Sequence, residues 1–269
     1  MSSLREHLAA LRFGWTAARP QEHGAWVILL VPLALGTVIS SVWSLAGVLG
    51  WVVCVGGLLL WPTASVASKA TRRGSPLPWG PLVIIGSIVT ISGAWIVALR
   101  PWFLVWIAGD LLLIGLELMW GARRSRPVAL QQSIAVAGLS QGAALIPYLA
   151  GGEIAYEPFG LWALCAGYFG ASYICVKTRA QWAVRPQTST AGSRLFFTAV
   201  NTGLLSIGGV LGWWFGLSIW VLASLSPTAV RGVYTAVKPP QSIRFKTEGM
   251  RELVFALILV VHITVVLGL

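Results

Sequence analysis

Residues 19–42 read RPQEHGAWVILLVPLALGTVISSV, a short charged segment that leads directly into an apolar helix. Pro20 and Gly24 bracket Glu22 and His23, so this pair is predicted to lie where the chain turns from the membrane surface into the bilayer. Ionisable groups inside membrane segments are usually functional, which makes Glu22 and His23 candidate catalytic residues. In the alternative interpretation, Glu22 caps the helix start, where the helix dipole favours negative charge, and His23 anchors the interface.

The composition excludes an ordinary soluble globular protein. The chain of 269 residues is 57% hydrophobic and 10% charged, and its mean hydropathy is +0.79. Its apolar runs are too long and too uniform for barrel strands, so each must be a helix that satisfies its own backbone hydrogen bonds. The sequence therefore predicts an all-α, polytopic membrane helix bundle.

Apolar stretches long enough to cross about 30 Å of hydrocarbon occur nine times. The predicted spans are residues 26–42, 45–67, 81–99, 102–120, 130–150, 158–176, 196–213, 215–237 and 252–269. They form a single transmembrane domain over residues 26–269. Residues 1–25 are predicted to be a separate amphipathic segment, because Leu4, Leu8 and Leu11 share one helical face while arginines occupy another.

Basic residues predict the orientation of these spans. All of the 19 Lys and Arg residues except Arg100 fall in the N-terminal segment, in the connections after the second, fourth, sixth and eighth spans, or, for Arg231, near the inner end of the eighth span. Such residues accumulate on the cytoplasmic side. The sequence therefore predicts a multi-pass protein of the inner (plasma) membrane, with its N-terminus in the cytoplasm and its C-terminus outside. Membrane lipids are the expected partners, and nucleic acid is not.

A faint internal repeat divides the bundle. Ala64-Ser65 precedes Lys69 at the inner end of the second span, and Ala171-Ser172 precedes Lys177 at the inner end of the sixth. Equivalent positions of this kind indicate two four-helix halves plus a last helix. Glycines are spread evenly, and Gly208-Gly209 is the midspan pair in the seventh span. Broken midplane helices of the transporter type are therefore not expected.

The order of spans and basic loops resembles the UbiA superfamily of intramembrane prenyltransferases. Local similarities are Arg19-Pro-Gln-Glu-His-Gly-Ala-Trp26, Thr71-Arg-Arg-Gly-Ser-Pro-Leu77 and Arg123-Arg-Ser-Arg-Pro127. That resemblance implies an isoprenoid substrate and catalytic aspartate motifs in the loops after the second and sixth helices. Here, residues 61–81 and 177–194 contain no Asp or Glu, and the single aspartate is Asp110. Mg²⁺ needs several carboxylate or phosphate oxygens, so the resemblance would have to extend to a transferase without a metal site.

A closer resemblance is to the YwiC-like membrane proteins. It is carried by Glu22-His-Gly-Ala-Trp26, by Trp61-Pro62 followed by Lys69, and by Glu117 before a basic cluster. Tyr168-Phe-Gly-Ala-Ser172 and the stretch from Gly249 to Glu252 add to it. The family brings no activity that could be transferred to this chain.

Basic side chains at the inner ends of the spans are the predicted ligand-binding residues, together with one carboxylate that follows a Gly-rich basic entry to the last helix. They are Lys69, Arg72, Arg73, Arg123, Arg124, Lys177, Arg179 and Glu252. Guanidinium groups bind phosphate or carboxylate through paired hydrogen bonds without a metal. In the alternative interpretation, these cations serve topology and contact anionic headgroups.

Carboxylates inside the bilayer are expected to have partners. Glu117 is a third candidate catalytic residue and lies seven residues from Asp110, on the same face of the fourth span. Both acids are expected to pair with a base from a neighbouring helix, and in the alternative interpretation they take part in a proton relay or contact a ligand. Glu248 is interpreted as a helix cap, and His262 as a core histidine with a satisfied hydrogen bond. No Walker loop, dinucleotide fingerprint or zinc spacing is present, so no cofactor and no metal are predicted.

Three functions fit these patterns. The first is binding of an amphiphilic anionic ligand, such as an isoprenoid or lipid phosphate, at a basic cytoplasmic mouth, with or without transferase chemistry. The second is a transporter or flippase of a small organic anion, and the third is a non-catalytic membrane subunit. The sequence leaves the substrate, the oligomeric state and the presence of turnover open.

Overall fold

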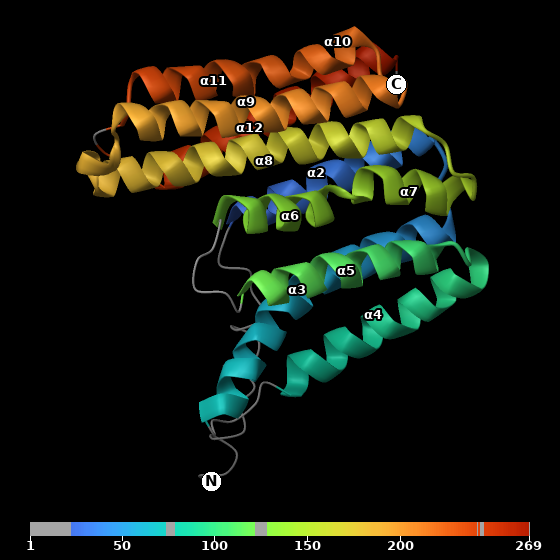
Figure 1. Cartoon of the computed structure of the whole chain (residues 1–269). Helices are drawn as coiled ribbons and strands as arrows, with labels where there is room; N and C mark the ends of the chain where they lie inside the picture. The colour runs from blue at the N-terminus through green and yellow to red at the C-terminus, as the bar shows by residue number, and fades with distance from the viewer. Residues whose placement is uncertain (1–22, 74–78, 122–127, 241, 243–244, 269) are drawn as a thin grey trace.

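The computed structural model describes residues 23–73, 79–121, 128–240, 242 and 245–268. Secondary structure in this part of the chain is helical throughout (Figure 1). The helices are α2 (His23–Ser40), α3 (Leu45–Arg73), α4 (Trp79–Leu99), α5 (Phe103–Gly121), α6 (Val128–Ser140), α7 (Gly142–Gly151), α8 (Glu157–Val184), η1 (Pro186–Thr188), α9 (Ala191–Trp214), α10 (Ile219–Leu222), η2 (Ala223–Leu225), α11 (Ser226–Val237) and α12 (Phe245–Leu267).

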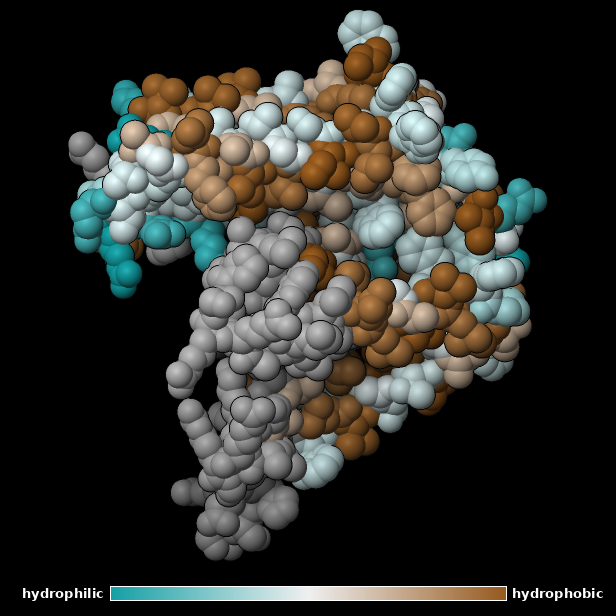
Figure 2. Space-filling view, viewed as in Figure 1, coloured by the Kyte–Doolittle hydropathy of each residue, from teal (hydrophilic) through white to brown (hydrophobic). Residues whose placement is uncertain are grey.

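The membrane character of the bundle is confirmed. Within the described residues, six helical segments are long and apolar enough to cross a membrane: Leu45–Ala64, Trp79–Leu99, Ile134–Gly151, Glu157–Val184, Ala191–Trp214 and Thr247–Leu267. Two shorter apolar helices, Gly24–Ser40 and Phe103–Leu113, correspond to the first and fourth predicted spans. The count of nine spans stays a prediction. Figure 2 shows hydrophilic side chains at both ends of the bundle and a largely hydrophobic surface between them.

The helices pack in three layers (Figure 1). The first holds α8, α9, α11 and α12, the second holds α2, α6 and α7, and the third holds α3, α4 and α5. Contacts between α6 and α8 and between α2 and α12 join the first two layers, and α3 against α7 joins the third. The largest core cluster lies in the first two layers, around Leu161, Leu164, Cys165 and Leu259.

Three connections meet at one end of the bundle. The Ser44 hydroxyl, before α3, donates to the carbonyl of Leu149 in α7 at 3.3 Å, and Arg100, between α4 and α5, donates to the same carbonyl through Nε at 3.4 Å. The connection from α7 to α8 begins three residues after Leu149, at Gly152. All three connections were predicted to face outward. Their position at the same end of the bundle agrees with the order of crossings that the basic residues indicate. Which side of a membrane they face stays a prediction.

The expectation of unbroken spans was wrong for the fifth and eighth. The fifth is divided at Gln141, between α6 and α7. The backbone N–H of Gln141 donates at 3.2 Å to the carbonyl of Gly138, three residues back instead of the four of a regular α-helix. Pro147, farther along in α7, has no backbone N–H to donate. In the eighth, Pro227 starts α11, and the chain passes through η2 before it. Hydropathy alone does not register either break.

Candidate functional site

Helix α8 carries a polar stripe on its buried side. Tyr168, Ser172, Cys175 and Arg179 follow one another at intervals of four, three and four residues, which places them on one face of the helix. The first three are buried in the bundle. The guanidinium of Arg179 is 11% exposed, so α8 brings a cation to the inner edge of its apolar body.

Helix α11 presents a matching stripe. Thr228, Arg231 and Thr235 are spaced by three and four residues, and both threonines are buried. The Thr235 hydroxyl accepts a hydrogen bond from Arg179 Nη1 at 3.2 Å and lies 3.5 Å from the Cys175 sulfur. The two helices thus face each other through polar groups, with Arg179 and Arg231 contributed one from each.

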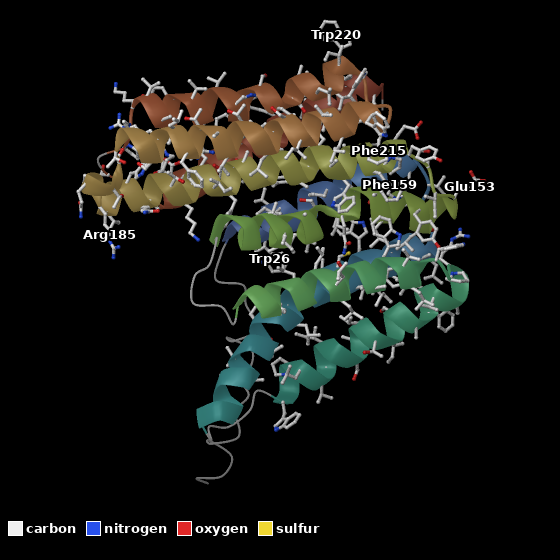
Figure 3. All side chains as sticks on the ribbon, viewed as in Figure 1. Trp26, Glu153, Phe159, Arg185, Phe215 and Trp220 are labelled. Atoms are coloured by element: carbon white, nitrogen blue, oxygen red, sulfur yellow. The ribbon has the colours of Figure 1, made fainter. Side chains whose placement is uncertain are left out.

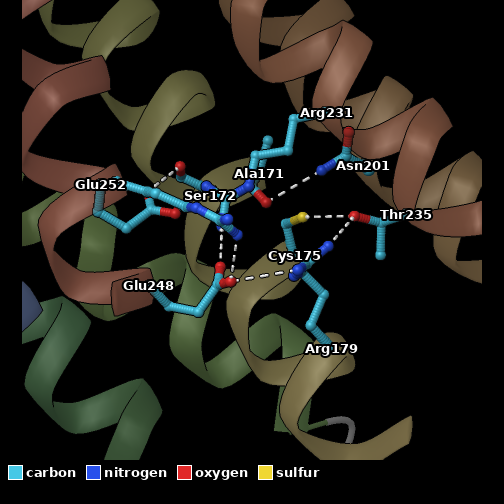
Figure 4. A network of polar contacts seen from close by, with 10 residues as sticks. Ala171, Ser172, Cys175, Arg179, Asn201, Arg231, Thr235, Glu248 and Glu252 are labelled. Atoms are coloured by element: carbon cyan, nitrogen blue, oxygen red, sulfur yellow. Dashed lines mark hydrogen bonds and ion pairs between the residues drawn. The ribbon is translucent and has the colours of Figure 1, made fainter. Parts of the chain in front are cut away.

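The first turns of α12 supply the counter-charges. Glu248 accepts from Arg179 Nη2 at 3.1 Å, from Arg231 Nη2 at 3.0 Å and from Arg251 Nη1 at 2.8 Å. Glu252, one turn later, pairs with Arg231 and accepts a hydrogen bond from the Ser172 hydroxyl (Figure 4). We call these five charged residues, Arg179, Arg231, Arg251, Glu248 and Glu252, the charge network.

The charge network is largely buried and unbalanced. Glu248 is 5% exposed and Arg231 is 10% exposed, whereas Arg251 at the edge is 56% exposed. Three guanidinium groups meet two carboxylates, which leaves one positive charge in excess. The Arg179 Nε is buried and without a hydrogen-bond partner. Chemically, the arrangement can hold a further anion at its exposed edge.

Comparison with known proteins locates a family match in the first half of the chain. Residues 20–146 match the sequence profile of the family described as YwiC-like protein. This part of the chain, which we call the YwiC-like region, is similar to that family. The predicted resemblance is thereby confirmed over that range. No curated protein and no solved structure matches the chain.

The charge network lies beyond the YwiC-like region. Its members lie between residues 179 and 252, whereas the match ends at residue 146. Several predicted site residues do fall in the YwiC-like region. Of these, Glu22, Arg123 and Arg124 lie outside the described residues.

The remaining predicted residues of the YwiC-like region are placed by backbone alone. His23 is the first residue of α2, Glu117 lies in the last turns of α5, and Lys69, Arg72 and Arg73 belong to the end of α3; their side chains are outside the description. Figure 1 draws the end of α3 in the third layer, apart from the ends of α8 and α12. The convergence of Lys69 with the other predicted residues stays a prediction.

In the second half of the chain, Arg179 and Glu252 were predicted as ligand-binding residues. Both belong to the charge network, where their partners are groups of the chain itself. Lys177 is exposed on α8, with its ammonium 6.0 Å from the centre of the Tyr173 ring. It lies two residues from Arg179, on another face of the helix.

Sequence reasoning missed the central role of Glu248, which was interpreted as a helix cap, and the hydroxyl groups of Ser172 and Thr235. The signal that could have found them is the spacing by three and four residues along α8 and α11. Asp110 was expected to pair with a base, but among the described residues both of its oxygens accept from the Gln141 side-chain amide, at 2.9 and 2.8 Å. His262 is satisfied as expected, by the carbonyl of Trp220 at 2.8 Å.

Metal-binding groups do not gather in the part of the chain that the structure describes. No three His, Cys, Asp or Glu residues there are close enough together to hold a metal ion. Guanidinium groups are therefore what the charge network offers to a ligand.

Proposed function

We propose that this membrane protein binds an anionic amphiphile of the isoprenoid phosphate or lipid phosphate type, with its phosphate at the exposed edge of the charge network. The observation that carries the proposal is the excess of one guanidinium over the carboxylates, which falls on Arg251 at the exposed edge, because the four more buried groups balance in charge. An anion that reaches this edge can pair with that guanidinium.

Arg251 is the residue suited to receive the phosphate. It is half exposed, and its guanidinium donates to Glu248 at 2.8 Å through Nη1, which leaves other donors of the fork available at the surface. Phosphate oxygens accept paired hydrogen bonds from such a fork. Arg231 lies deeper in the charge network and adds to the positive field there, because it shares the Glu248 carboxylate with Arg251.

The surface of α12 suits the apolar part of the same ligand. Val254, Ile258 and Val261 are exposed and follow Arg251 at three, seven and ten residues, so they continue the face on which Arg251 lies. A chain lying along this stripe would keep its phosphate beside Arg251. The resemblance to the UbiA superfamily favours an isoprenoid, and transfer chemistry by Glu22, His23 and Glu117 stays a prediction beyond binding.

Transport of a small organic anion is the second candidate function. It is favoured by the break of the fifth span at Gln141, beside the carboxylate of Asp110. Discontinuous helices with ionisable groups near the break are typical of transporter binding sites. Flux of the anion into sealed vesicles would support this function. Binding without flux would support the first candidate function, which is binding of an anionic amphiphile.

The proposal is tested by thermal unfolding of the purified protein in a neutral detergent, with farnesyl phosphate or farnesol added. A ligand at 100 times its Kd stabilises by about 2.7 kcal/mol, so we expect farnesyl phosphate to raise the Tm by roughly 5 °C, and farnesol to raise it little. Arg251→Gln should weaken the phosphate effect about tenfold in affinity, since a charge-assisted hydrogen bond contributes about 1.5 kcal/mol or more.

Arg185→Gln is the matched control. Arg185 ends α8 at the same end of the bundle, is exposed, and lies outside the charge network (Figure 3). Its replacement should leave the response to farnesyl phosphate unchanged. Equal stabilisation by farnesol, or an equal loss of response in the two arginine variants, would contradict the proposal.

A further inference from the structure

Asp110 lies in the apolar body of α5 and is held by one neutral side chain. Its two carboxylate oxygens lie 2.9 and 2.8 Å from Gln141 Nε2. Gln141 is the residue at which the fifth span breaks, between the last residue of α6 and the first of α7. A side-chain amide at the break thus lies against an acid inside the bundle.

The break is supported by its own hydrogen bonds. The backbone N–H of Gln141 donates to the carbonyl of Gly138. The carbonyl of Ala137, which would accept that hydrogen bond in a regular helix, is therefore left without it. That carbonyl accepts instead from the indole of Trp162 in α8, at 2.8 Å. The Ser140 hydroxyl beside the break is buried and without a partner. The discontinuity is thus a built feature of the bundle.

The charge of Asp110 has no compensating cation in the described part of the chain. Neither α4 nor α6, which pack against α5, contains a titratable residue in its sequence. Cys54 of α3 is also near Asp110, and a thiol has no cationic form. Tyr148, Arg100 and Glu153 lie toward the end of the bundle, where Arg100 is engaged with Leu149.

One amide donor does not offset an ionised carboxylate in an apolar span, because such a charge costs several kcal/mol. The protonated acid removes the charge and keeps the contact: its hydroxyl can donate to the Gln141 carbonyl once the amide turns over, since the amide carries both a donor and an acceptor. A hard cation would need more oxygen ligands than this pair supplies. The proton is therefore the ligand that the pair fits.

A pocket lies about one helical turn from this pair, at the end of the bundle. Its volume is about 160 Å³, and it lies between α5, α7 and the start of α8. Trp106, one turn before Asp110, Ala144, one turn after Gln141, and Glu153 of the α7–α8 connection are among its lining residues. Figure 3 shows Glu153 and Phe159 at this end. Phe159 stacks on Trp106 with ring centres 5.6 Å apart, which gives the pocket an aromatic wall.

We propose that Asp110 and Gln141 form an intramembrane proton-binding site that exchanges with water through the pocket ending at Glu153. The proton binds to a carboxylate oxygen of Asp110 as the Gln141 amide turns from donor to acceptor, and leaves by the reverse step. The site lies apart from the charge network and does not depend on the anion bound there.

Infrared spectroscopy of the full-length protein in lipid bilayers tests this directly, because a protonated carboxyl group has a C=O stretching band that the carboxylate lacks. At neutral pH the wild type should show such a band, and it should be lost in Asp110→Asn. Gln141→Leu should shift the frequency of the band and raise its midpoint pH, since the ionised form loses its charge-assisted hydrogen bond.

Glu153→Gln tests the exchange path separately, since Glu153 is exposed in the connection and lines the pocket. It should leave the equilibrium band in place and slow its response to a pH jump. A wild-type spectrum that matches that of Asp110→Asn at neutral pH would show that Asp110 is ionised and would overturn the proposal. If Asp110→Asn does not fold, an unchanged band in Gln141→Leu would overturn it equally.

Discussion

Glu248→Ala should lower the Tm of the protein in detergent by about 10 °C. Glu248 is buried and accepts from Arg179, Arg231 and Arg251, so its removal leaves two buried guanidinium groups short of a counter-charge. Breaking a buried ion pair by removing one partner costs roughly 3–5 kcal/mol, and each kcal/mol shifts Tm by about 2–4 °C in a chain of this size. Thermal unfolding followed by circular dichroism measures the change.

The matched control is Glu157→Ala. Glu157 is an exposed acid in the first turn of α8, and it makes no ion pair among the described residues. Its replacement should change Tm by no more than about 1–2 °C. Adding Arg179→Met to Glu248→Ala should recover part of the lost stability, because it removes one of the uncompensated charges. Equal Tm values for the two alanine variants would contradict the central position of Glu248.

Gly167→Ala should destabilise the bundle by about 3 kcal/mol, through the contact of α8 with α9. A Cβ at Gly167 would lie 2.7 Å from the Leu204 carbonyl oxygen and 2.9 Å from the Cα of Gly208. Both neighbours are backbone atoms, so the two helices would have to move apart. Close approach of this kind is what small residues permit between membrane helices. The measurement is again thermal unfolding, at equal protein and detergent concentrations.

Gly203→Ala on α9 is the control for that change. No atom lies within 4 Å of the position that its Cβ would take. Alanine is about 0.8–1 kcal/mol better than glycine in a helix, so this variant should be as stable as the wild type or slightly more so. If Gly167→Ala unfolds at the same temperature as Gly203→Ala, then α8 and α9 do not pack at the described distance.

The helices could be predicted from hydropathy, but their ends could not. The sixth span was predicted to end at residue 176, whereas α8 continues to Val184, because Trp182 is buried against Phe197 of α9. The break at Gln141 was not predicted, since averaging over a window of apolar residues ignores the local hydrogen-bond pattern of the backbone. Such breaks depend on backbone geometry and on partners such as Trp162 in another helix.

The candidate site was predicted in part. Arg179 and Glu252 were chosen as charged groups at inner helix ends, and they do belong to one cluster. Their partners could not be predicted, because Glu248 lies 69 residues from Arg179, and the pairing requires α12 to pack beside both α8 and α11. Charge in the sequence indicates which residues need a partner, and the packing of helices decides whether that partner is a ligand or another side chain.

Mass spectrometry of the amphiphiles that co-purify in a mild neutral detergent tests the central claim most directly. The proposed function predicts that a phosphate-bearing amphiphile is retained by the wild type and by Arg185→Gln, and is depleted about tenfold in Arg251→Gln. Retention of neutral and zwitterionic lipids alone, in equal amounts by all three proteins, would contradict it.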